Sequence, residues 1–405
     1  MLPVNIGVVG IGGYGRTYMR VIETLEGEGV GCLYAAVIRN RPKYAQEAEV
    51  LEARGVRIRA SLEEMLEKDA QQLGIVAIPT GIPMHRQQMI QSVEAGCDVL
   101  LEKPPTATIQ DMDAMLAALE RTGRWCQVGF QNQAKSTVRA LKHLLGEGRL
   151  GCIQTVVVKG CWVRRDSYYE RNPWAGRLRF QGEWVLDGTV NNPLAHYLMN
   201  ALYFAQPEWG RIATPIRVRA ELYHAHDIES EDTSAVEIET AEGTRIFFFA
   251  TLCAEKHSDV LIEVVGDKGT ALWPAKGDVE IRLTDGTTEK IPDPGDDCRV
   301  GIFRNALLYK AGKVAELDCP LAMTRSLVLA VNGVFKSAGP PRAIAPVYLN
   351  VYHDAQANSR AVEIKGISDW IARAFAERRL FSDLGVPWAY RTQFFTLDGF
   401  RSFDL

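Results

Sequence analysis

Residues 4–15 read VNIGVVGIGGYG, a short apolar run that ends in a glycine-rich turn. Apolar residues at helical spacing follow from 14 to 25, so the glycines lie between a predicted strand and a predicted helix. A G-x-G-x-x-G turn there lets the backbone approach a pyrophosphate, and the N–H groups of the helix N-terminus attract phosphate. We therefore predict a dinucleotide site at Gly10, Gly12, Gly13, Tyr14 and Gly15.

Short apolar runs alternate with helical segments as far as residue 129. The predicted strands are 5–9, 33–38, 57–59, 73–78, 99–101 and 125–129. The predicted helices between them are 14–25, 42–54, 62–67, 84–95 and 111–121. This alternation is typical of an α/β fold with a doubly wound parallel sheet of the Rossmann type.

Longer β-branched and aromatic runs follow residue 131 and predict a large, mostly antiparallel open sheet. Its expected strands are 153–163, 216–223, 234–239, 245–252 and 260–265. Helices are expected at 136–145, 193–204 and 321–337, and a strand at 347–352 and a helix at 367–379 come last. We expect a Rossmann domain at 1–130, an α/β substrate and oligomerisation domain at 131–340, and an extension at 341–405 that packs on the second domain.

Composition excludes several classes of protein. The 405 residues carry a net charge of −4, with 47% hydrophobic and 24% charged residues, as in ordinary globular proteins. A broad basic field for nucleic acid and an apolar run long enough for a membrane helix are both missing from the sequence. The eight cysteines are scattered, without a CxxC pair. We expect reduced, mostly buried thiols in a cytoplasmic protein.

The end of the second predicted strand bears on the choice of cofactor. It reads Val37-Ile38-Arg39-Asn40-Arg41, where a carboxylate for the ribose hydroxyls of NAD usually stands. Arginine pairs with the 2′-phosphate that a carboxylate would repel. Arg39 and Arg41 therefore favour NADP over NAD, although these arginines could also be solvated charges or stack on the adenine. Arg39 and Asn40 are the candidate cofactor-binding residues of this segment.

Glu102-Lys103-Pro104 follows the fifth predicted strand of the parallel sheet. Ligands bind at the carboxyl ends of such strands, so Lys103 can serve as an acid or base beside a nicotinamide. Alone, a lysine at a strand end is more often a solvated charge.

In combination, the glycine-rich turn, Ala77-Ile78-Pro79-Thr80, Glu102-Lys103-Pro104 and Val128-Gly129-Phe130 resemble the glucose-fructose oxidoreductase / inositol dehydrogenase / rhizopine catabolism (Gfo/Idh/MocA) family. The resemblance implies an NAD(P)-dependent oxidoreductase that moves a hydride between the nicotinamide and a hydroxyl or carbonyl of a sugar, polyol or derivative. It further implies a homo-oligomer, dimer or tetramer, formed through the open sheet. Lys103 matches the catalytic lysine of the family, and its cofactor-contacting segments contain Pro79, Thr80, His85, Glu102 and Gln131.

The second catalytic motif departs from the family pattern. Asp187 matches an aspartate of the family, but Asn191 stands where a histidine is usual, and an amide cannot accept a proton. Asn192 and Pro193 suit the N-cap and first position of a helix, which would put His196 in the first turn. We expect Asp187, Asn191 or Asn192 to orient the substrate hydroxyl. His196 either assists or is a structural residue packed under the sheet.

Residues 164–182 show no clean period and are rich in aromatic and basic side chains. Aromatic rings stack on sugar C–H faces, and arginines and amides bind hydroxyls or carboxylates. The segment is interpreted as a wall of the substrate pocket, and a subunit contact is the alternative. The candidate substrate residues are Trp162, Arg164, Tyr168, Tyr169, Arg171, Asn172 and Trp174.

His224, His226 and Asp227 do not make a closed metal site by themselves, so we expect no metal. Two functions compete with a dehydrogenase. A redox-neutral enzyme would cleave or epimerise a sugar by transient oxidation with retained NAD, and a non-enzymatic regulator would only sense the cofactor.

Overall fold

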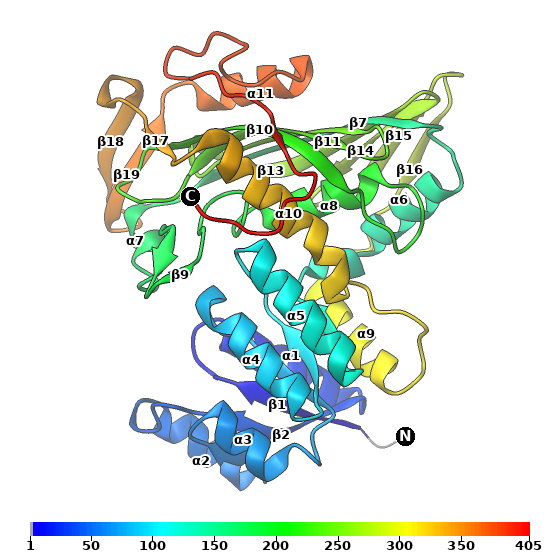
Figure 1. Cartoon of the computed structure of the whole chain (residues 1–405), viewed down its shortest axis with the longest axis vertical. Helices are drawn as coiled ribbons and strands as arrows, with labels where there is room; N and C mark the ends of the chain where they lie inside the picture. The colour runs from blue at the N-terminus through cyan, green and yellow to red at the C-terminus, as the bar shows by residue number, and fades with distance from the viewer. Residues whose placement is uncertain (1–2) are drawn as a thin grey trace. The chain divides into compact units, whose positions relative to one another are not determined.

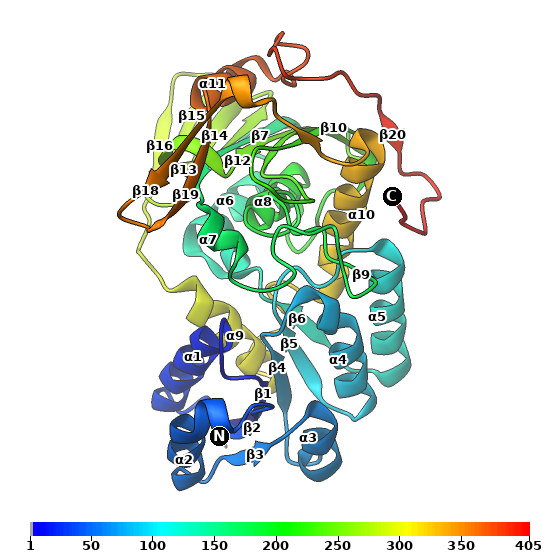
Figure 2. The ribbon, with the colours of Figure 1, turned by 90° about the vertical axis from the view of Figure 1, so that its left-hand side faces the viewer.

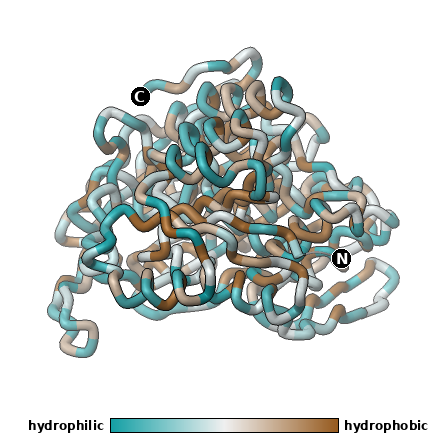
Figure 3. Tube along the Cα trace, turned by 90° about the horizontal axis from the view of Figure 1, so that it is seen from below, coloured by the Kyte–Doolittle hydropathy of each residue, from teal (hydrophilic) through white to brown (hydrophobic). Residues whose placement is uncertain are grey.

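The structure is a computed structural model that describes residues 3–405. The chain folds into two compact units. The first takes the chain up to residue 106, together with 110–135 and 296–324, and the second takes 107–109, 136–295 and 325–405. Hydrophobic residues lie mostly within the folded trace and hydrophilic residues on the outer loops (Figure 3).

The first unit is built on a six-stranded, wholly parallel sheet with the order β3-β2-β1-β4-β5-β6. Helices cover both of its faces (Figure 2). Its strands are β1 (Val4–Val9), β2 (Gly31–Val37), β3 (Arg57–Arg59), β4 (Ile75–Ile78), β5 (Asp98–Leu101) and β6 (Cys126–Val128). Its helices are α1 (Gly15–Gly27), α2 (Ala45–Ala53), α3 (Leu62–Asp69), α4 (Ile82–Glu94), α5 (Ile109–Thr122) and α9 (Cys298–Lys310), with short 3-10 turns η1 (Pro42–Tyr44) and η2 (Gln131–Ala134). The predicted doubly wound fold is confirmed, and the strand order reverses between β1 and β4, where such sheets bind ligands.

Helix α9 belongs to the first unit, whereas the expected domain boundaries put residues 296–324 in the second. Its apolar face packs on η2, and the ring of Phe303 lies 4.6 Å from that of Tyr18. Gln127 fixes the returning chain by donating to the carbonyl of Ile302 at 2.6 Å and accepting from the N–H of Cys319 at 3.2 Å. These contacts join residues that are far apart in the sequence, such as Gln127 and Ile302, so the local sequence pattern carries no sign of them.

The second unit holds a mostly antiparallel ten-stranded sheet. A large sheet of this kind was predicted from the sequence. Its main path is β16-β15-β14-β13-β7-β12-β11-β10-β17, with parallel pairing only at β7–β12 and β10–β17 among the described strands. The strands of this path are β7 (Ile153–Val163), β10 (Pro215–His224), β11 (Thr233–Thr240), β12 (Arg245–Thr251), β13 (Cys253–Gly266), β14 (Gly269–Pro274), β15 (Val279–Leu283), β16 (Thr288–Ile291) and β17 (Arg342–Ala343). Shorter pairs are β8 (Arg179–Phe180) with β9 (Glu183–Trp184) and β18 (Leu349–Asp354) with β19 (Ser359–Ile364), while β20 (Phe395–Thr396) pairs with β10.

Helices pack on both faces of this sheet (Figure 1). On one face lie α8 (Ala195–Ala205) and α10 (Leu321–Ala338), with α6 (Ser136–Gly146) against α8. On the other face lies α11 (Ile367–Glu377) of the C-terminal extension, which covers β7, β12 and β13. Phe381 of the extension is fully buried with Phe249 and Tyr223 of the sheet. The extension therefore completes a second hydrophobic core on this face of the sheet.

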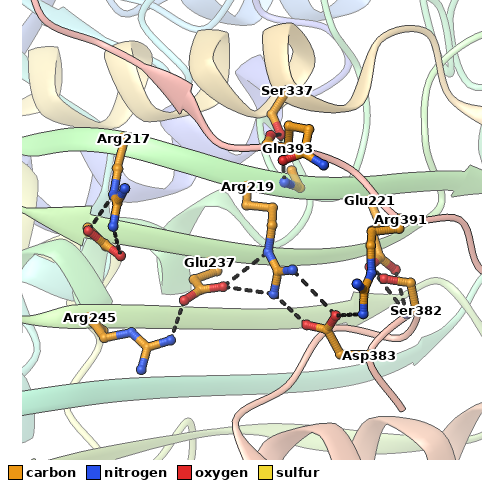
Figure 4. Close-up of polar contacts among 12 residues, drawn as sticks. Arg217, Arg219, Glu221, Glu237, Arg245, Ser337, Ser382, Asp383, Arg391 and Gln393 are labelled. Atoms are coloured by element: carbon orange, nitrogen blue, oxygen red, sulfur yellow. Dashed lines mark hydrogen bonds and ion pairs between the residues drawn. The ribbon is translucent and has the colours of Figure 1, made fainter. Parts of the chain in front are cut away.

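Charged side chains continue this contact beyond the apolar core (Figure 4). Arg219 of β10 donates to Glu237 of β11 at 3.0 Å and to Asp383 of the extension at 2.5 Å. Ser382 donates its hydroxyl to Glu221 at 2.6 Å. Across residues 3–405, every helix falls short of the length and apolarity that a membrane crossing requires. All eight cysteines are free thiols, and five of them are buried.

Candidate active site

The glycine-rich turn connects β1 to α1 in a form that only small residues fit. Gly10 has a φ of +96°, which disfavours any side chain. A Cβ on Gly15 would lie 2.3 Å from the carbonyl oxygen of Gly10, so the helix can pack against the strand only if this residue is glycine. A Cβ on Gly12 would lie 2.0 Å from the hydroxyl of Tyr44. The sequence did not show this last contact, because Tyr44 comes from η1, about thirty positions later.

The turn fits a dinucleotide. It lies at the carboxyl end of β1, and the first turn of α1 carries no acidic side chain that would repel a phosphate. The space around Gly10 and Gly13 is open, since a Cβ on either would meet no atom within 4 Å. The turn therefore leaves room for a pyrophosphate beside the N-terminus of α1, and the dinucleotide site stays a prediction.

Arg39 and Asn40 follow β2, where the ribose of a dinucleotide is bound in such folds. Both side chains are exposed. Arg41 is held by Glu52 through two hydrogen bonds of 2.8 and 2.7 Å, so it is committed to the protein. The side-chain oxygen of Asn40 accepts the backbone N–H of Lys43 at 3.2 Å and shapes the turn. Arg39 therefore stays the candidate cofactor-binding arginine of this segment.

Glu102 is buried directly after β5 and accepts the hydroxyl of Tyr18 at 3.0 Å. Burial raises the pKa of Glu102 to about 7, and the positive charge of Lys103 opposes the rise. A Cβ on Gly129 would lie 2.9 Å from a carboxyl oxygen of Glu102, so the glycine makes room for it. Glu102 is thus an internal support for the segment that carries Lys103.

The buried ring of His85 connects two of the predicted cofactor segments. Its Nδ1 lies 2.9 Å from the carbonyl oxygen of Pro104, and its Nε2 lies 3.0 Å from that of Thr80. Burial lowers the pKa of His85, so the neutral ring donates to one of these carbonyls at a time. Thr80 in turn donates its hydroxyl to Gln88 at 2.6 Å. The imidazole is engaged with backbone, which suits a positioning residue better than a direct ligand of the cofactor.

Arg299 of α9 is a site residue that the sequence did not single out. It lies beside Tyr14 of the glycine-rich turn. Together with Glu102 and Gln131 these residues line a cavity of about 10 Å³, room for about one water molecule. Burial raises the pKa of Tyr14 to about 12, so its hydroxyl stays protonated. Arg299 could be recognised as a site residue only once the structure placed α9 in the first unit.

In the second unit, Asp187 is fully committed to its neighbours. One carboxylate oxygen accepts from the guanidinium of Arg171 at 2.7 Å and from the N–H of Gly176 at 2.8 Å. The other accepts from the amide of Asn192 at 2.5 Å. Asp187 is 3% exposed, and the ion pair keeps it as an anchor for Arg171.

The predicted cap of the helix after Asp187 is wrong. Helix α8 begins at Ala195, with Leu194 at the N-cap position, because the side chain of Asn192 is taken by Asp187. Asn191 is buried and donates to the carbonyl of Val185 at 3.0 Å, so it supports the loop. His196 still lies in the first turn of α8 and is half-buried.

The predicted substrate segment forms a stack of cations on aromatic rings. The guanidinium of Arg171 lies 3.9 Å from the ring centre of Tyr168 and 5.5 Å from that of Trp174. Arg164 lies 4.9 Å from the ring of Tyr168 and 5.0 Å from that of Trp162. The structure thus brings five of the seven predicted residues together, with Asp187 behind Arg171.

Tyr169 and Asn172 take part in a different feature of the same unit, a cavity of about 560 Å³. The cavity lies between residues 166–177 and the turn 226–229. The ring of Tyr169 lies 4.9 Å from that of His226. Burial, followed by the negative charge of Asp232, raises the pKa of Tyr169. The lining of the cavity is rich in acidic side chains, namely Asp166, Glu170, Asp227 and Glu229.

Comparison with known proteins agrees with this geometry. The Rossmann-domain model of an oxidoreductase family, described as NAD-binding, matches residues 4–130. The model of the GFO/IDH/MocA C-terminal domain matches residues 138–272. An inositol 2-dehydrogenase of Pseudomonas savastanoi pv. phaseolicola is 24% identical over 283 residues, which cover 69% of this chain and 77% of the relative.

Two solved structures share the fold. The WlbA dehydrogenase of Bordetella pertussis, solved with NADH and UDP-GlcNAcA, is 24% identical, with a TM-score of 0.70 over 83% of this chain and 96% of its own. A levoglucosan dehydrogenase, solved with NADH and levoglucosan, is 16% identical, with a TM-score of 0.69 over 83% of this chain and 97% of its own. The chain therefore belongs to the Gfo/Idh/MocA family of oxidoreductases with an NAD-binding Rossmann fold, and the resemblance of its motifs is confirmed.

Proposed function

We propose that this protein oxidises a hydroxyl group of a sugar, a polyol or a related compound, with Lys103 as the acid/base. The observation that carries this assignment is the position of Lys103, next to Glu102 at the carboxyl end of β5 in the unit that holds the glycine-rich turn. A nicotinamide bound by that unit supplies hydride acceptance. Lys103 in its neutral amine form takes the proton of the substrate hydroxyl and becomes an ammonium, and the ammonium returns the proton when the reaction runs backwards.

Recognition of the substrate is assigned to the second unit. The flat stack of Arg171, Tyr168 and Trp174 suits the C–H faces and hydroxyls of a sugar ring. Asp187 fixes the guanidinium of Arg171 and leaves its aromatic contacts in place. Because Asp187 and Asn191 are both engaged inside the protein, Lys103 and His196 are the groups to which proton transfer is assigned.

Cofactor choice is assigned to Arg39, which favours NADP(H) over NAD(H). The two solved relatives were determined in complex with NADH. Recognition of a 2′-phosphate can differ between members of one fold, because it depends on this single segment. Arg39→Ala is expected to weaken NADPH binding about tenfold or more, with little change for NADH. Equal loss for both nucleotides would contradict a role for Arg39 at the 2′-phosphate.

We also infer that the protein works in the cytoplasm as a homo-oligomer. Eight free thiols suit a reducing compartment. Helix α11 and Phe381 cover part of the sheet. A subunit interface formed by the sheet would therefore use the part of its surface that the extension leaves uncovered. Sedimentation of the full chain tests this inference, since a dimer or tetramer supports it and a monomer contradicts it.

Lys103→Ala in the full chain is the direct test of the reaction. Turnover of a panel of sugars and polyols is followed both by the nicotinamide absorbance and by product analysis. We expect loss of about 100-fold or more in kcat for Lys103→Ala, and wild-type rates for the exposed Lys68→Ala. Unchanged turnover by Lys103→Ala overturns the assignment. Product without net nicotinamide reduction would instead favour the redox-neutral reaction, and no turnover by the wild type together with a co-purifying partner would favour a regulator.

A further inference from the structure

We propose that the second unit binds a divalent metal ion of the zinc class between His226, Asp232 and Cys253. The Nδ1 of His226 lies 3.0 Å from a carboxylate oxygen of Asp232 and 3.2 Å from the sulfur of Cys253. The three ligand atoms all lie within 4.8 Å of one another. Each of the three residues is 2% exposed or less, so the ligand atoms lie beneath the surface.

The sheet brings these residues together from three separate strands. Tyr223 near the end of β10 pairs with Thr233, which begins β11, and Thr233 pairs with Thr251 at the end of β12. His226 follows β10, Asp232 precedes β11, and Cys253 begins β13. Because these strand ends lie at the same end of the sheet, residues 226, 232 and 253 come together there. Their spacing in the sequence matches no known metal-binding motif.

The donor set selects the class of metal. A thiol, an imidazole and a carboxylate together suit Zn²⁺, which binds four ligands in a tetrahedron, whereas Mg²⁺ and Ca²⁺ prefer oxygen alone. The fourth position is assigned to water or to the hydroxyl of Tyr169. That hydroxyl is buried, has no hydrogen-bond partner among residues 3–405, and sits on a ring 4.9 Å from the ring of His226.

The surroundings of the other ring nitrogen of His226, Nε2, favour a ring that binds a metal through Nδ1. Nε2 is buried, lacks a hydrogen-bond partner within residues 3–405, and lies 3.8 Å from a carboxylate oxygen of Asp166. If Nδ1 carried the proton for Asp232, Nε2 and Asp166 would be two acceptors facing each other. A metal on Nδ1 moves the N–H to Nε2, where it donates toward Asp166, the usual second partner of a metal-bound histidine.

The metal would tie the substrate segment to the sheet. Asp166 opens the short helix α7 (Asp166–Tyr169) and is also held by Arg360 of β19 at 3.2 Å. Arg171 follows five residues later and binds Asp187. The metal would therefore have a structural role, and its presence does not depend on the redox assignment above.

Metal content of the full chain, expressed without a histidine tag, tests the site. Protein stripped with a chelator is titrated with Zn²⁺ against a competing indicator and, separately, with Co²⁺. Cys253→Ser and His226→Gln each remove one ligand. His353→Gln and Cys152→Ser are the matched controls, because His353 is an exposed residue of β18 and Cys152 is an exposed free thiol.

We expect about one Zn²⁺ per chain in the wild type and in both controls, and affinity at least about tenfold weaker in Cys253→Ser and His226→Gln. The Co²⁺ form of the wild type should show thiolate-to-cobalt charge-transfer absorption that Cys253→Ser lacks. Weak or absent binding of both ions by folded wild-type protein overturns the site. Equal binding by all variants also overturns it. If a ligand variant fails to fold, the wild-type Co²⁺ spectrum still decides.

Discussion

Replacing Glu102 by glutamine should stabilise the protein, and only at high pH. Burial raises the pKa of Glu102 from the usual 4.5 to about 7. Below pH 4.5 the carboxyl is protonated in both the folded and the unfolded chain. As the pH rises from 4.5 to 7, the unfolded chain loses this proton first, so the free energy of unfolding falls. At about 1.4 kcal/mol per pKa unit, the full loss above pH 7 is about 3 kcal/mol.

Glu102→Gln has no proton to lose and can still accept the hydroxyl of Tyr18. We therefore expect its free energy of unfolding to match that of the wild type near pH 4.5 and to exceed it by up to about 3 kcal/mol at pH 8. Urea denaturation followed by circular dichroism at four pH values measures this difference. Glu67→Gln, at an exposed position, is the control. The reasoning is refuted if Glu102→Gln is less stable than the wild type at pH 8, or if the difference does not vary with pH.

Two further substitutions test the second unit. Arg171→Gln leaves the buried carboxylate of Asp187 without its cation, so it should lower the free energy of unfolding by about 2–3 kcal/mol and weaken substrate binding. Arg177→Gln, which breaks only an exposed pair with Glu229, should cost less than about 1 kcal/mol, and similar losses for the two variants in urea denaturation would contradict the role of Asp187. Phe381→Ala removes a fully buried ring of the extension and should cost about 3–5 kcal/mol. A cost below about 1 kcal/mol, measured in the same way, would mean that the extension is not part of the core.

The first unit was predictable because its signals are local. The glycine-rich turn, the short apolar strands and the helices between them follow one another in sequence, and each lies within a few residues of its expected bounds. The family motifs then located Lys103 and Glu102. Arg299 escaped because nothing near position 299 indicates that α9 returns to the parallel sheet.

The second unit was predictable in class but not in detail. Runs of β-branched and aromatic residues predicted the strands β7 and β10 to β13, although not β14, β15 and β16. Most of the aromatic and basic residues from Trp162 onward do form one stack. The start of α8 was wrong because Asn192 had two possible partners, and the buried carboxylate of Asp187 competed successfully with the helix N-terminus. The cluster of His226, Asp232 and Cys253 could not be predicted, because it depends on which strand ends lie side by side in the sheet. No single segment of the sequence reveals the order of the strands.

Fluorescence titration of the cofactor-stripped full chain with NADH and NADPH tests the central claim, that the glycine-rich turn holds the nicotinamide nucleotide. Gly15→Ala and Gly27→Ala are compared with the wild type. A Cβ on Gly15 would lie 2.3 Å from the carbonyl oxygen of Gly10, whereas one on Gly27, in the same helix, meets no atom within 4 Å.

We expect the wild type and Gly27→Ala to bind at least one of the two nucleotides equally well. Gly15→Ala should bind it at least about tenfold more weakly, a loss of about 1.4 kcal/mol or more. Tighter binding of NADPH than of NADH by the wild type would support the role of Arg39. Unchanged binding by Gly15→Ala, or binding of neither nucleotide by the wild type, would contradict the account.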